Sequence, residues 1–149
     1  MLGRDVLFIC TGNYYRSRFA ELLFNHLAKL YCLPIRSFSK GIEPYHVDNV
    51  GLISQHTVDY LTKLGVDLTN LSEPLPLTEQ DFDEGAIAIA MSEKEHRPMM
   101  AKKFPRWENC ITYWNFEDEY LISPTVLLPR LEERVKALLG NLKTDNHLP

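Results

Sequence analysis

The sequence predicts a single α/β domain over residues 1–149, in which a small parallel sheet of four strands is flanked by helices on both faces. Short apolar runs without polar alternation are typical of strands buried on both faces, and they alternate along the chain with segments of helical apolar spacing. The composition, 45% hydrophobic and 24% charged over 149 residues, leaves room for one core. Such a sheet binds ligands at the carboxyl ends of its strands.

The first predicted unit is a strand, a tight loop and a helix. Residues 6–9 form the apolar run of the strand, and Cys10 follows it. The helix is expected over residues 17–31, with Ser17 as a candidate N-cap. The apolar residues at helical spacing are Phe19, Leu22, Leu23, Leu27 and Leu30.

The second unit is marked by breaks in the chain. Residues 35–39 are the second candidate strand, and residues 41–44 interrupt the chain before a helical pattern that ends near Gly65. Two prolines make residues 70–78 a loop, and residues 78–81 fit a brief capped turn. A second strand and helix therefore follow the first.

The rest of the chain continues the alternation. Residues 86–90 are the third candidate strand, Ser92 begins a capping-box pattern that starts a helix, and residues 111–114 are the fourth candidate strand. The last helix is expected to end at Gly140, and Pro129 leaves its start open.

The charge and cysteine counts exclude several classes of protein. Sixteen basic and twenty acidic side chains give a net charge of -4 without a basic stripe, which disfavours nucleic-acid binding. No apolar stretch approaches the roughly 20 residues of a membrane helix, and the N-terminus does not resemble a secretion signal, so we expect a cytoplasmic protein. Three cysteines without CxxC spacing and five histidines without shared ligand spacing predict no disulfide framework, metal site or cofactor.

One loop carries the chemistry. Cys10 and Arg16 are separated by five residues and followed by Ser17, between a predicted strand and a predicted helix. A loop of this size can wrap so that backbone N–H groups point inward, and the helix N-terminus adds to their positive field. Arg16 can hold two phosphate oxygens with its planar guanidinium. The candidate phosphate-binding residues between them are Thr11, Gly12, Asn13, Tyr14 and Tyr15.

The same field acts on Cys10. Helix N-termini and nearby cations favour thiolate over thiol, so the cradle is expected to activate its own nucleophile. Ser17 can donate a hydrogen bond to this sulfur. Gly12 permits backbone conformations barred to other residues, and Asn13 tolerates the left-handed one. A buried thiol beside a surface arginine is the competing interpretation, but the strand and helix on either side favour a site.

These residues resemble the signature of the low-molecular-weight protein tyrosine phosphatases, Cys-x-Gly-Asn-x-x-Arg-Ser. The resemblance extends over most of the domain. Residues 39–41 are similar to a Ser-Ala-Gly strand end of the family, residues 77–82 to its turn before the third strand, and residues 90–91 to the end of that strand. The resemblance implies a four-stranded parallel sheet and a phosphocysteine intermediate.

A phosphomonoesterase also needs a proton donor for the leaving oxygen. The family carries an Asp-Pro-aromatic motif late in the chain, and residues 117–120 occupy that place, with Glu119 where the proline is usual. Asp118 is the candidate acid, and its acidic neighbours favour its protonated form. Glu117 and Glu119 are the alternative donors.

An aryl phosphate needs a deep slot with aromatic walls. The candidate wall residues are Tyr14, Tyr15, Tyr45 and Tyr120. The resulting hypothesis is a protein tyrosine phosphatase that acts on phosphotyrosine proteins or small aryl phosphates, with phosphate, sulfate, vanadate or arsenate as further anions of the loop. A phosphate- or phosphoprotein-binding module without turnover is the alternative.

Several positions depart from the family pattern. Arg18 stands where proline is common, and we expect it to face solvent in the first helical turn. Many members have a second cysteine near the nucleophile, which Gly12 and Tyr15 do not supply, so oxidised Cys10 lacks an adjacent resolving thiol. The related arsenate reductases need two further cysteines after the third strand, and residues 91–105 contain none, which disfavours arsenate reduction.

Overall fold

A computed structural model describes residues 5–44, 49–83 and 85–145. Four strands form one sheet in the order β2-β1-β3-β4, and all neighbours pair in parallel. The predicted α/β class is therefore confirmed. The strands are β1 (Val6–Cys10), β2 (Ser37–Gly41), β3 (Ile87–Ala90) and β4 (Thr112–Tyr113). The helices are α1 (Arg16–Leu30), α2 (Gln55–Lys63), α3 (Glu79–Asp83), α4 (Glu93–Lys103), the 3-10 turn η1 (Pro105–Trp107) and α5 (Pro124–Asp145).

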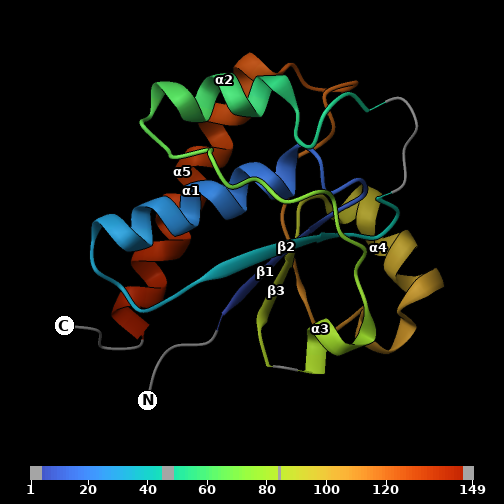
Figure 1. The fold of residues 1–149 in the computed structure, drawn as a ribbon. Coiled ribbons are helices and arrows are strands. Elements are labelled where there is room, and N and C mark those ends of the chain that lie inside the picture. Colours follow the sequence, from blue (N-terminus) through green and yellow to red (C-terminus); the bar gives the residue numbers. More distant parts are fainter. Residues whose placement is uncertain (1–4, 45–48, 84, 146–149) are drawn as a thin grey trace.

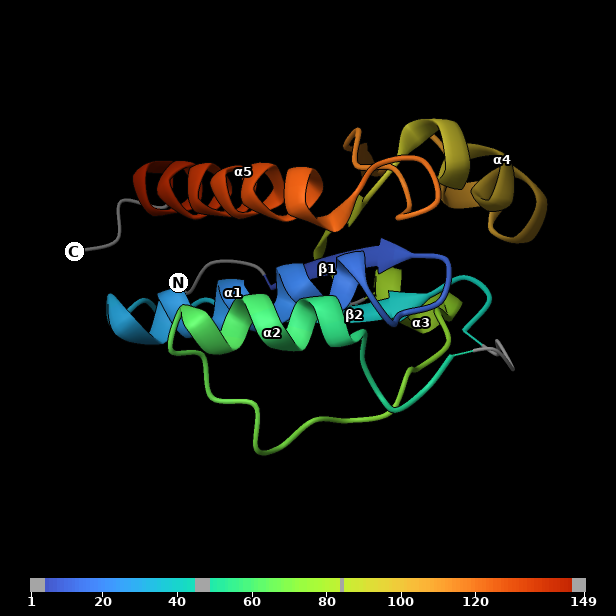
Figure 2. The same cartoon turned by 90° about the horizontal axis from the view of Figure 1, so that it is seen from above.

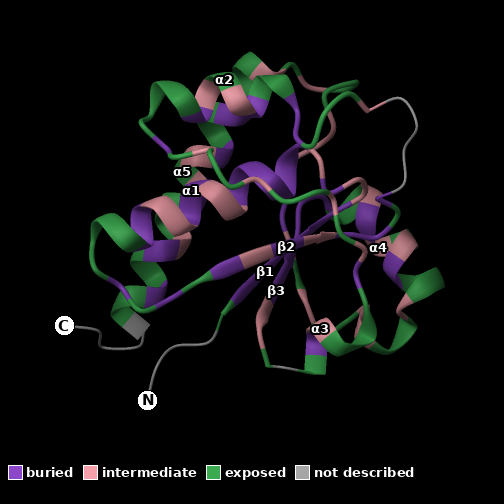
Figure 3. Cartoon of the chain, viewed as in Figure 1, coloured by how far each residue is buried: buried purple, intermediate pink, exposed green. Residues whose placement is uncertain are grey.

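The helices cover both faces of the sheet (Figures 1 and 2). The β1 side chains alternate between the faces, so that Val6 and Phe8 pack in a core with residues of α1, α2 and α5. Leu7 and Ile9 pack on the other face with Phe82 of α3 and residues of α4 and η1. All five residues of β1 are buried (Figure 3), which explains its lack of polar alternation.

The strand order places the carboxyl end of β1 at a switch point. The chain leaves β1 through α1 to reach β2 on one side, and later returns to β3 on the other side. Connections diverge there, which leaves a crevice at the end of the strand. Cys10, the last residue of β1, pairs with Gly41 of β2 and lies at this crevice.

Two sequence-based boundaries need correction, and the structure supplies the start of the last helix, which the sequence left open. The second strand runs over Ser37–Gly41, two residues later than expected, because its register sets Gly41 opposite Cys10. The last helix continues through Gly140 to Asp145 and begins at Pro124. Ser123 caps this start, since its Oγ accepts from the Thr125 N–H at 3.3 Å, and proline fits the first helical position. Pro129 is tolerated inside the helix.

Burial of one side of α5 accounts for its length despite a proline and a glycine. The buried residues of this side are Leu127, Leu128, Leu131, Val135, Leu139 and Leu142. Tertiary packing of such a stripe stabilises a helix more than intrinsic propensity does. No helix in the described part of the chain combines the length and apolar character needed to cross a membrane.

Candidate active site

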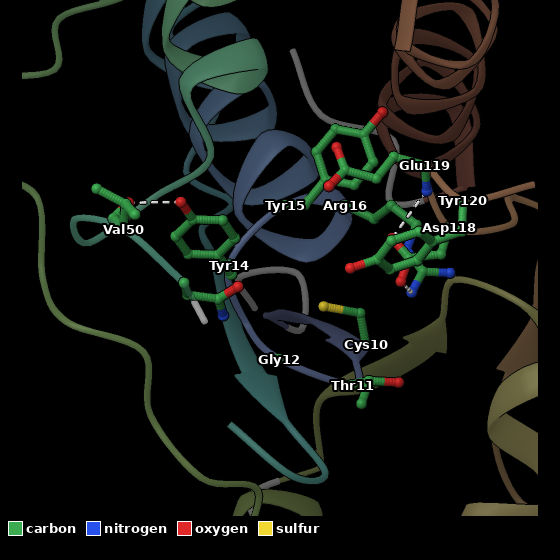
Figure 4. A pocket seen from close by; sticks show the side chains of 11 residues that line it. Cys10, Thr11, Gly12, Tyr14, Tyr15, Arg16, Val50, Asp118, Glu119 and Tyr120 are labelled. Carbon is green, nitrogen blue, oxygen red and sulfur yellow. Dashed lines mark hydrogen bonds and ion pairs between the residues drawn. The ribbon is translucent and has the colours of Figure 1, made fainter. Parts of the chain in front are cut away.

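The loop between β1 and α1 forms the floor of a cavity of about 280 Å³ (Figure 4). Its lining comes from three segments that are far apart in the sequence and meet at the carboxyl end of β1. The lining residues are Cys10, Thr11, Gly12, Tyr14, Tyr15 and Arg16 from the loop and α1, Asn49 and Val50, and Asp118, Glu119 and Tyr120 after β4. The structure thus brings most of the predicted site residues together.

The Cys10 thiol is only 2% exposed and lies against Ser17, with 2.9 Å between Sγ and Oγ. Asn13 Nδ2 donates to Ser17 Oγ at 3.0 Å, so the Ser17 hydroxyl hydrogen remains available for the sulfur. A hydroxyl hydrogen bond of this kind stabilises a thiolate. Ser17 is not the N-cap that the sequence suggested. The helix begins at Arg16 with Tyr15 in the cap position, and its cap makes no side-chain hydrogen bond.

Asn13 braces the loop and does not line the cavity. Its φ of 51° is left-handed, as expected for the residue. Its Nδ2 also donates to Ser39 Oγ at 2.8 Å, and its Oδ1 accepts from the Leu75 N–H at 2.9 Å. Ser39 in turn donates to the carboxylate of Glu21 on α1. The amide therefore ties the loop to β2 and to a distant segment.

The close approach of β2 to this loop requires Gly41, not Gly12. A Cβ at Gly41 would lie 2.8 Å from the Thr11 carbonyl oxygen and 2.9 Å from the Asn13 nitrogen. Backbone atoms cannot yield as a flexible side chain can. At Gly12, by contrast, the nearest atom to a Cβ is 3.7 Å away and φ is not positive. The predicted conformational need at Gly12 is therefore wrong.

Arg16 is buried, and its guanidinium is held from behind by Glu95 of α4. Nη1 donates to Glu95 Oε1 at 2.9 Å and Nη2 to Oε2 at 2.8 Å. Nη1 also donates to the Phe116 carbonyl oxygen at 2.9 Å. Burial opposes the charge, but the hydrogen bonds that Arg16 donates to Glu95 hold its pKa above the ordinary value. Its Nε has no partner among the described residues.

Sequence reasoning missed Glu95 and His96 as site residues. Burial alone would raise the pKa of Glu95, but hydrogen bonds from His96 and Arg16 hold it well below its usual range. His96, interpreted from the sequence as an ordinary residue, is 0% exposed, and burial lowers its pKa. The capping-box pattern from Ser92 to Glu95 was the sequence signal that pointed to this helical turn. Ser92 Oγ does accept from the Glu95 N–H at 3.3 Å, while the Glu95 carboxylate reaches the loop instead of the helix end.

Arg18 does not face solvent as the sequence suggested. It is 2% exposed and donates to three carbonyl oxygens. Nη1 lies 3.3 Å from the oxygens of Asn13 and Leu52, and Nη2 lies 2.6 Å from that of Ser72. Burial lowers the pKa of Arg18, and the nearby Glu21 carboxylate opposes this effect. Arg18 thus anchors two long loops to the phosphate-binding loop.

The candidate acids lie after β4. Asp118 Oδ2 is 3.8 Å from Arg16 Nη2, and its Oδ1 accepts from the Glu119 N–H at 2.8 Å. Glu119 also lines the cavity, and its Oε2 lies 3.7 Å from His56 Nε2. Glu117 lines a neighbouring cavity instead. Two of the three candidate donors therefore line the same cavity as Cys10.

The tyrosines lie at different depths (Figure 4). Tyr120 is 87% exposed at the rim. Tyr14 lines the cavity and donates to the Val50 carbonyl oxygen at 2.5 Å. Tyr15 is buried with no hydrogen-bond partner for its hydroxyl in the described part, and burial and the nearby Glu119 raise its pKa. Tyr45 lies outside the described residues.

Comparison with known proteins identifies the family. The family model of the low molecular weight phosphotyrosine protein phosphatases matches residues 5–147. The chain belongs to this family. It is therefore one of the cysteine-dependent phosphatases, which are hydrolases.

Individual relatives support the same assignment. A protein-arginine-phosphatase of Bacillus subtilis is 30% identical over 105 residues, which span 70% of this chain and 66% of the relative. The solution structure of a low molecular weight protein tyrosine phosphatase from B. subtilis is 26% identical with a TM-score of 0.73, covering 95% of this chain and 99% of the other. The YwlE arginine phosphatase with a phosphorylated active-site serine is 25% identical with a TM-score of 0.77, covering 97% and 99%.

The positions of the three free thiols predict that peroxide inactivates this phosphatase irreversibly. Cys32 follows the far end of α1, which at about 1.5 Å per residue is more than 20 Å from Cys10. Cys110 precedes β4, at the opposite end of the sheet from Cys10. Neither can approach within disulfide range, so sulfenic acid at Cys10 is expected to oxidise further. Mass spectrometry should find sulfinic or sulfonic acid there. Full recovery of activity with thiol after prolonged peroxide treatment would contradict this expectation.

Proposed function

We propose that this phosphatase hydrolyses aryl phosphomonoesters, phosphotyrosine among them, through a phosphocysteine at Cys10. One observation carries the proposal: the Cys10 sulfur and Arg16 line the same cavity, at the N-terminus of α1. Loop amides, a helix N-terminus and a guanidinium together create a site for a tetrahedral oxyanion beside a nucleophile.

The reaction follows in two displacements. The Cys10 thiolate attacks phosphorus, the S–P bond forms, and the ester O–P bond breaks as Asp118 gives its proton to the leaving phenolate. Asp118, now a carboxylate, then accepts a proton from water that attacks the phosphocysteine. The S–P bond breaks, phosphate leaves, and Ser17 stabilises the thiolate that is regenerated.

Asp118 is favoured as the acid because it lies on the Arg16 side of the cavity, where the phosphoryl group binds. Its separation of 3.8 Å from Arg16 Nη2 places its carboxyl close to the phosphoryl oxygens and to the leaving oxygen beyond them. Glu119 shares the cavity, but its Oε2 lies 3.7 Å from Nε2 of the exposed His56. Glu117 belongs to the neighbouring cavity.

The Asp118→Asn variant tests this role through the leaving group. Phenyl phosphate leaves a strongly basic phenolate, whereas para-nitrophenyl phosphate leaves a weakly basic one that needs little protonation. We expect kcat/KM, which reports the steps up to the phosphocysteine, to fall by about 10²-fold or more on phenyl phosphate and much less on para-nitrophenyl phosphate. Loss of the Asp118 carboxylate also slows hydrolysis of the phosphocysteine, a step that both substrates share, so kcat falls on both. Glu117→Gln is the matched control and should keep both rates. Equal losses of kcat/KM on both substrates would show that Asp118 is not the acid. A selective loss on phenyl phosphate in Glu119→Gln would assign the role to Glu119 instead.

Phosphoarginine proteins are a second candidate substrate. The carboxylates of Asp118 and Glu119 and the ring of Tyr120 surround the mouth of the cavity. A planar guanidinium leaving group could pair with such carboxylates and stack on the ring. The activity named for the Bacillus relative agrees with this chemistry. The ratio of kcat/KM for phosphotyrosine and phosphoarginine peptides decides between the two.

The proposal also covers the anions that the phosphate-binding loop accepts and the cellular compartment of the protein. Inorganic phosphate, sulfate, vanadate and arsenate have the tetrahedral shape and charge that the loop would accept. The free thiols of Cys10, Cys32 and Cys110 suit a reducing compartment, and we therefore include a cytoplasmic location. Binding of phosphate without turnover of any aryl phosphate would favour the non-catalytic binding module.

A further inference from the structure

We propose that Glu95 is a positioning residue that selects which edge of the Arg16 guanidinium meets the substrate phosphoryl group. The inference rests on the proposed function, because it assigns a geometry to the same site. It follows from an inventory of donors and acceptors around Arg16, a residue that carries five N–H groups in a fixed plane.

Three of the five Arg16 hydrogens are already committed. Glu95 accepts two of them, at 2.9 Å from Nη1 and 2.8 Å from Nη2, across the end of the guanidinium. The Phe116 carbonyl oxygen accepts the second hydrogen of Nη1 at 2.9 Å. The remaining donors are Nε–H and the second hydrogen of Nη2, which lie side by side on one edge. Nε is buried without a partner among the described residues.

This edge makes no hydrogen bond within the described part of the chain, although Asp118 Oδ2 lies 3.8 Å from Nη2. It is suited to two oxygens of one phosphoryl group. A carboxylate bound across the end of a guanidinium fixes its plane and leaves the Nε–Nη2 edge as the only bidentate donor pair. Without Glu95, the end of the guanidinium could turn towards the anion instead. The same anion would then be bound in another orientation relative to the Cys10 sulfur.

Glu95 is itself held in place by several donors. In addition to Arg16, its Oε2 accepts from Thr11 Oγ1 at 2.5 Å and lies 3.1 Å from His96 Nε2. The Ser92 N–H donates to His96 Nδ1 at 3.1 Å, so the proton of a neutral His96 is on Nε2 and points towards Glu95 and Thr11. The carboxylate therefore connects α4 to both ends of the phosphate-binding loop.

The charge of Glu95 has a separate consequence. A carboxylate beside Arg16 partly cancels the positive field that attracts a free anion. Such an arrangement weakens the binding of ground-state phosphate while it orients the donors for the transition state. Removal of the Glu95 charge is thus expected to raise the affinity for free phosphate while it lowers kcat. Replacement of a residue with a purely structural role would lower both.

The experiment compares Glu95→Gln with Glu93→Gln, which removes a charge from the same helical turn. Glu93 is exposed and pairs with Arg97, away from the loop. For Glu95→Gln on phenyl phosphate, we expect kcat to fall by about 10- to 100-fold while inorganic phosphate binds several-fold more tightly by calorimetry. Glu93→Gln should change both quantities by less than about twofold.

Glu95→Asp is the second variant and keeps the charge on a shorter side chain. We expect its kcat to fall while phosphate affinity stays near that of the wild type. Unchanged kcat in either variant would overturn the proposal, and so would a parallel loss of kcat and phosphate affinity in Glu95→Gln. Turnover by the wild type is measured first and tests the proposed function by itself. If the wild type does not turn over substrate, the phosphate affinities of the variants can still be compared, and they test the role of Glu95.

Discussion

Replacement of Cys10 by serine is expected to abolish turnover while phosphate binding persists. Serine is close to cysteine in size, and Ser17 and Asn13 would still brace the loop around it. A hydroxyl at this position has no adjacent general base and is a far weaker nucleophile than a thiolate at neutral pH. We expect kcat on para-nitrophenyl phosphate to fall by about 10⁵-fold or more, the scale on which removal of a nucleophile acts.

The other two cysteines provide matched controls. Cys32 and Cys110 are exposed and lie outside the cavity, so Cys32→Ser and Cys110→Ser should keep wild-type rates. Calorimetric titration of Cys10→Ser with inorganic phosphate checks that the cradle remains. Turnover within about tenfold of the wild type would show that another group attacks phosphorus. Loss of phosphate binding would show that the sulfur itself shapes the loop.

The Arg18→Met variant is expected to lose about 3 kcal/mol of unfolding free energy at pH 8. Methionine retains much of the apolar stem but leaves the carbonyl oxygens of Leu52 and Ser72 without their donor. It also removes the cation near Glu21, whose pKa is already raised by burial. Urea unfolding followed by circular dichroism measures the change. Arg36→Met, on an exposed side chain, is the control and should change stability by less than about 0.5 kcal/mol.

The loss caused by Arg18→Met should depend on pH. Without Arg18, the folded-state pKa of Glu21 rises further above its unfolded value, which penalises the folded state when the unfolded carboxyl is ionised. The penalty is fully present above the folded pKa and disappears below the unfolded one. The difference from the wild type should therefore be larger at pH 8 than at pH 5. A pH-independent difference would show that the lost carbonyl hydrogen bonds account for all of it.

The nucleophilic loop was predictable because its chemistry is local. Cys10, Arg16 and Ser17 lie within eight consecutive residues, and a strand and a helix on either side fix how they converge. Left-handed Asn13 follows from the same local reasoning. The alternation of apolar runs and helical spacing likewise predicted the parallel sheet, because burial of strands on both faces leaves a direct trace in residue type.

Sequence-based predictions for individual side chains failed where a contact with a residue distant in the chain outweighed a local pattern. Ser17 fits an N-cap by its position, but its hydroxyl is engaged with the Cys10 sulfur. Arg18 fits an exposed first turn, but carbonyl groups from residues 52 and 72 surround it. Glu95 fits a capping box, but the bond to Arg16 joins positions 79 residues apart. Helical propensity and capping patterns contain no information about such partners.

The fold class and the phosphate-binding loop follow from the amino-acid sequence alone, because both depend on the spacing of residues that are close together in the chain. The tertiary structure was needed to show which edge of Arg16 makes no hydrogen bond, which acids share the cavity with Cys10, and why Gly41 has no side chain. These features depend on contacts between segments that are distant in the chain and that the sheet brings together. At the crevice beyond β1, the positions of a few buried donors and acceptors set the chemistry, and residue spacing along the chain does not encode them.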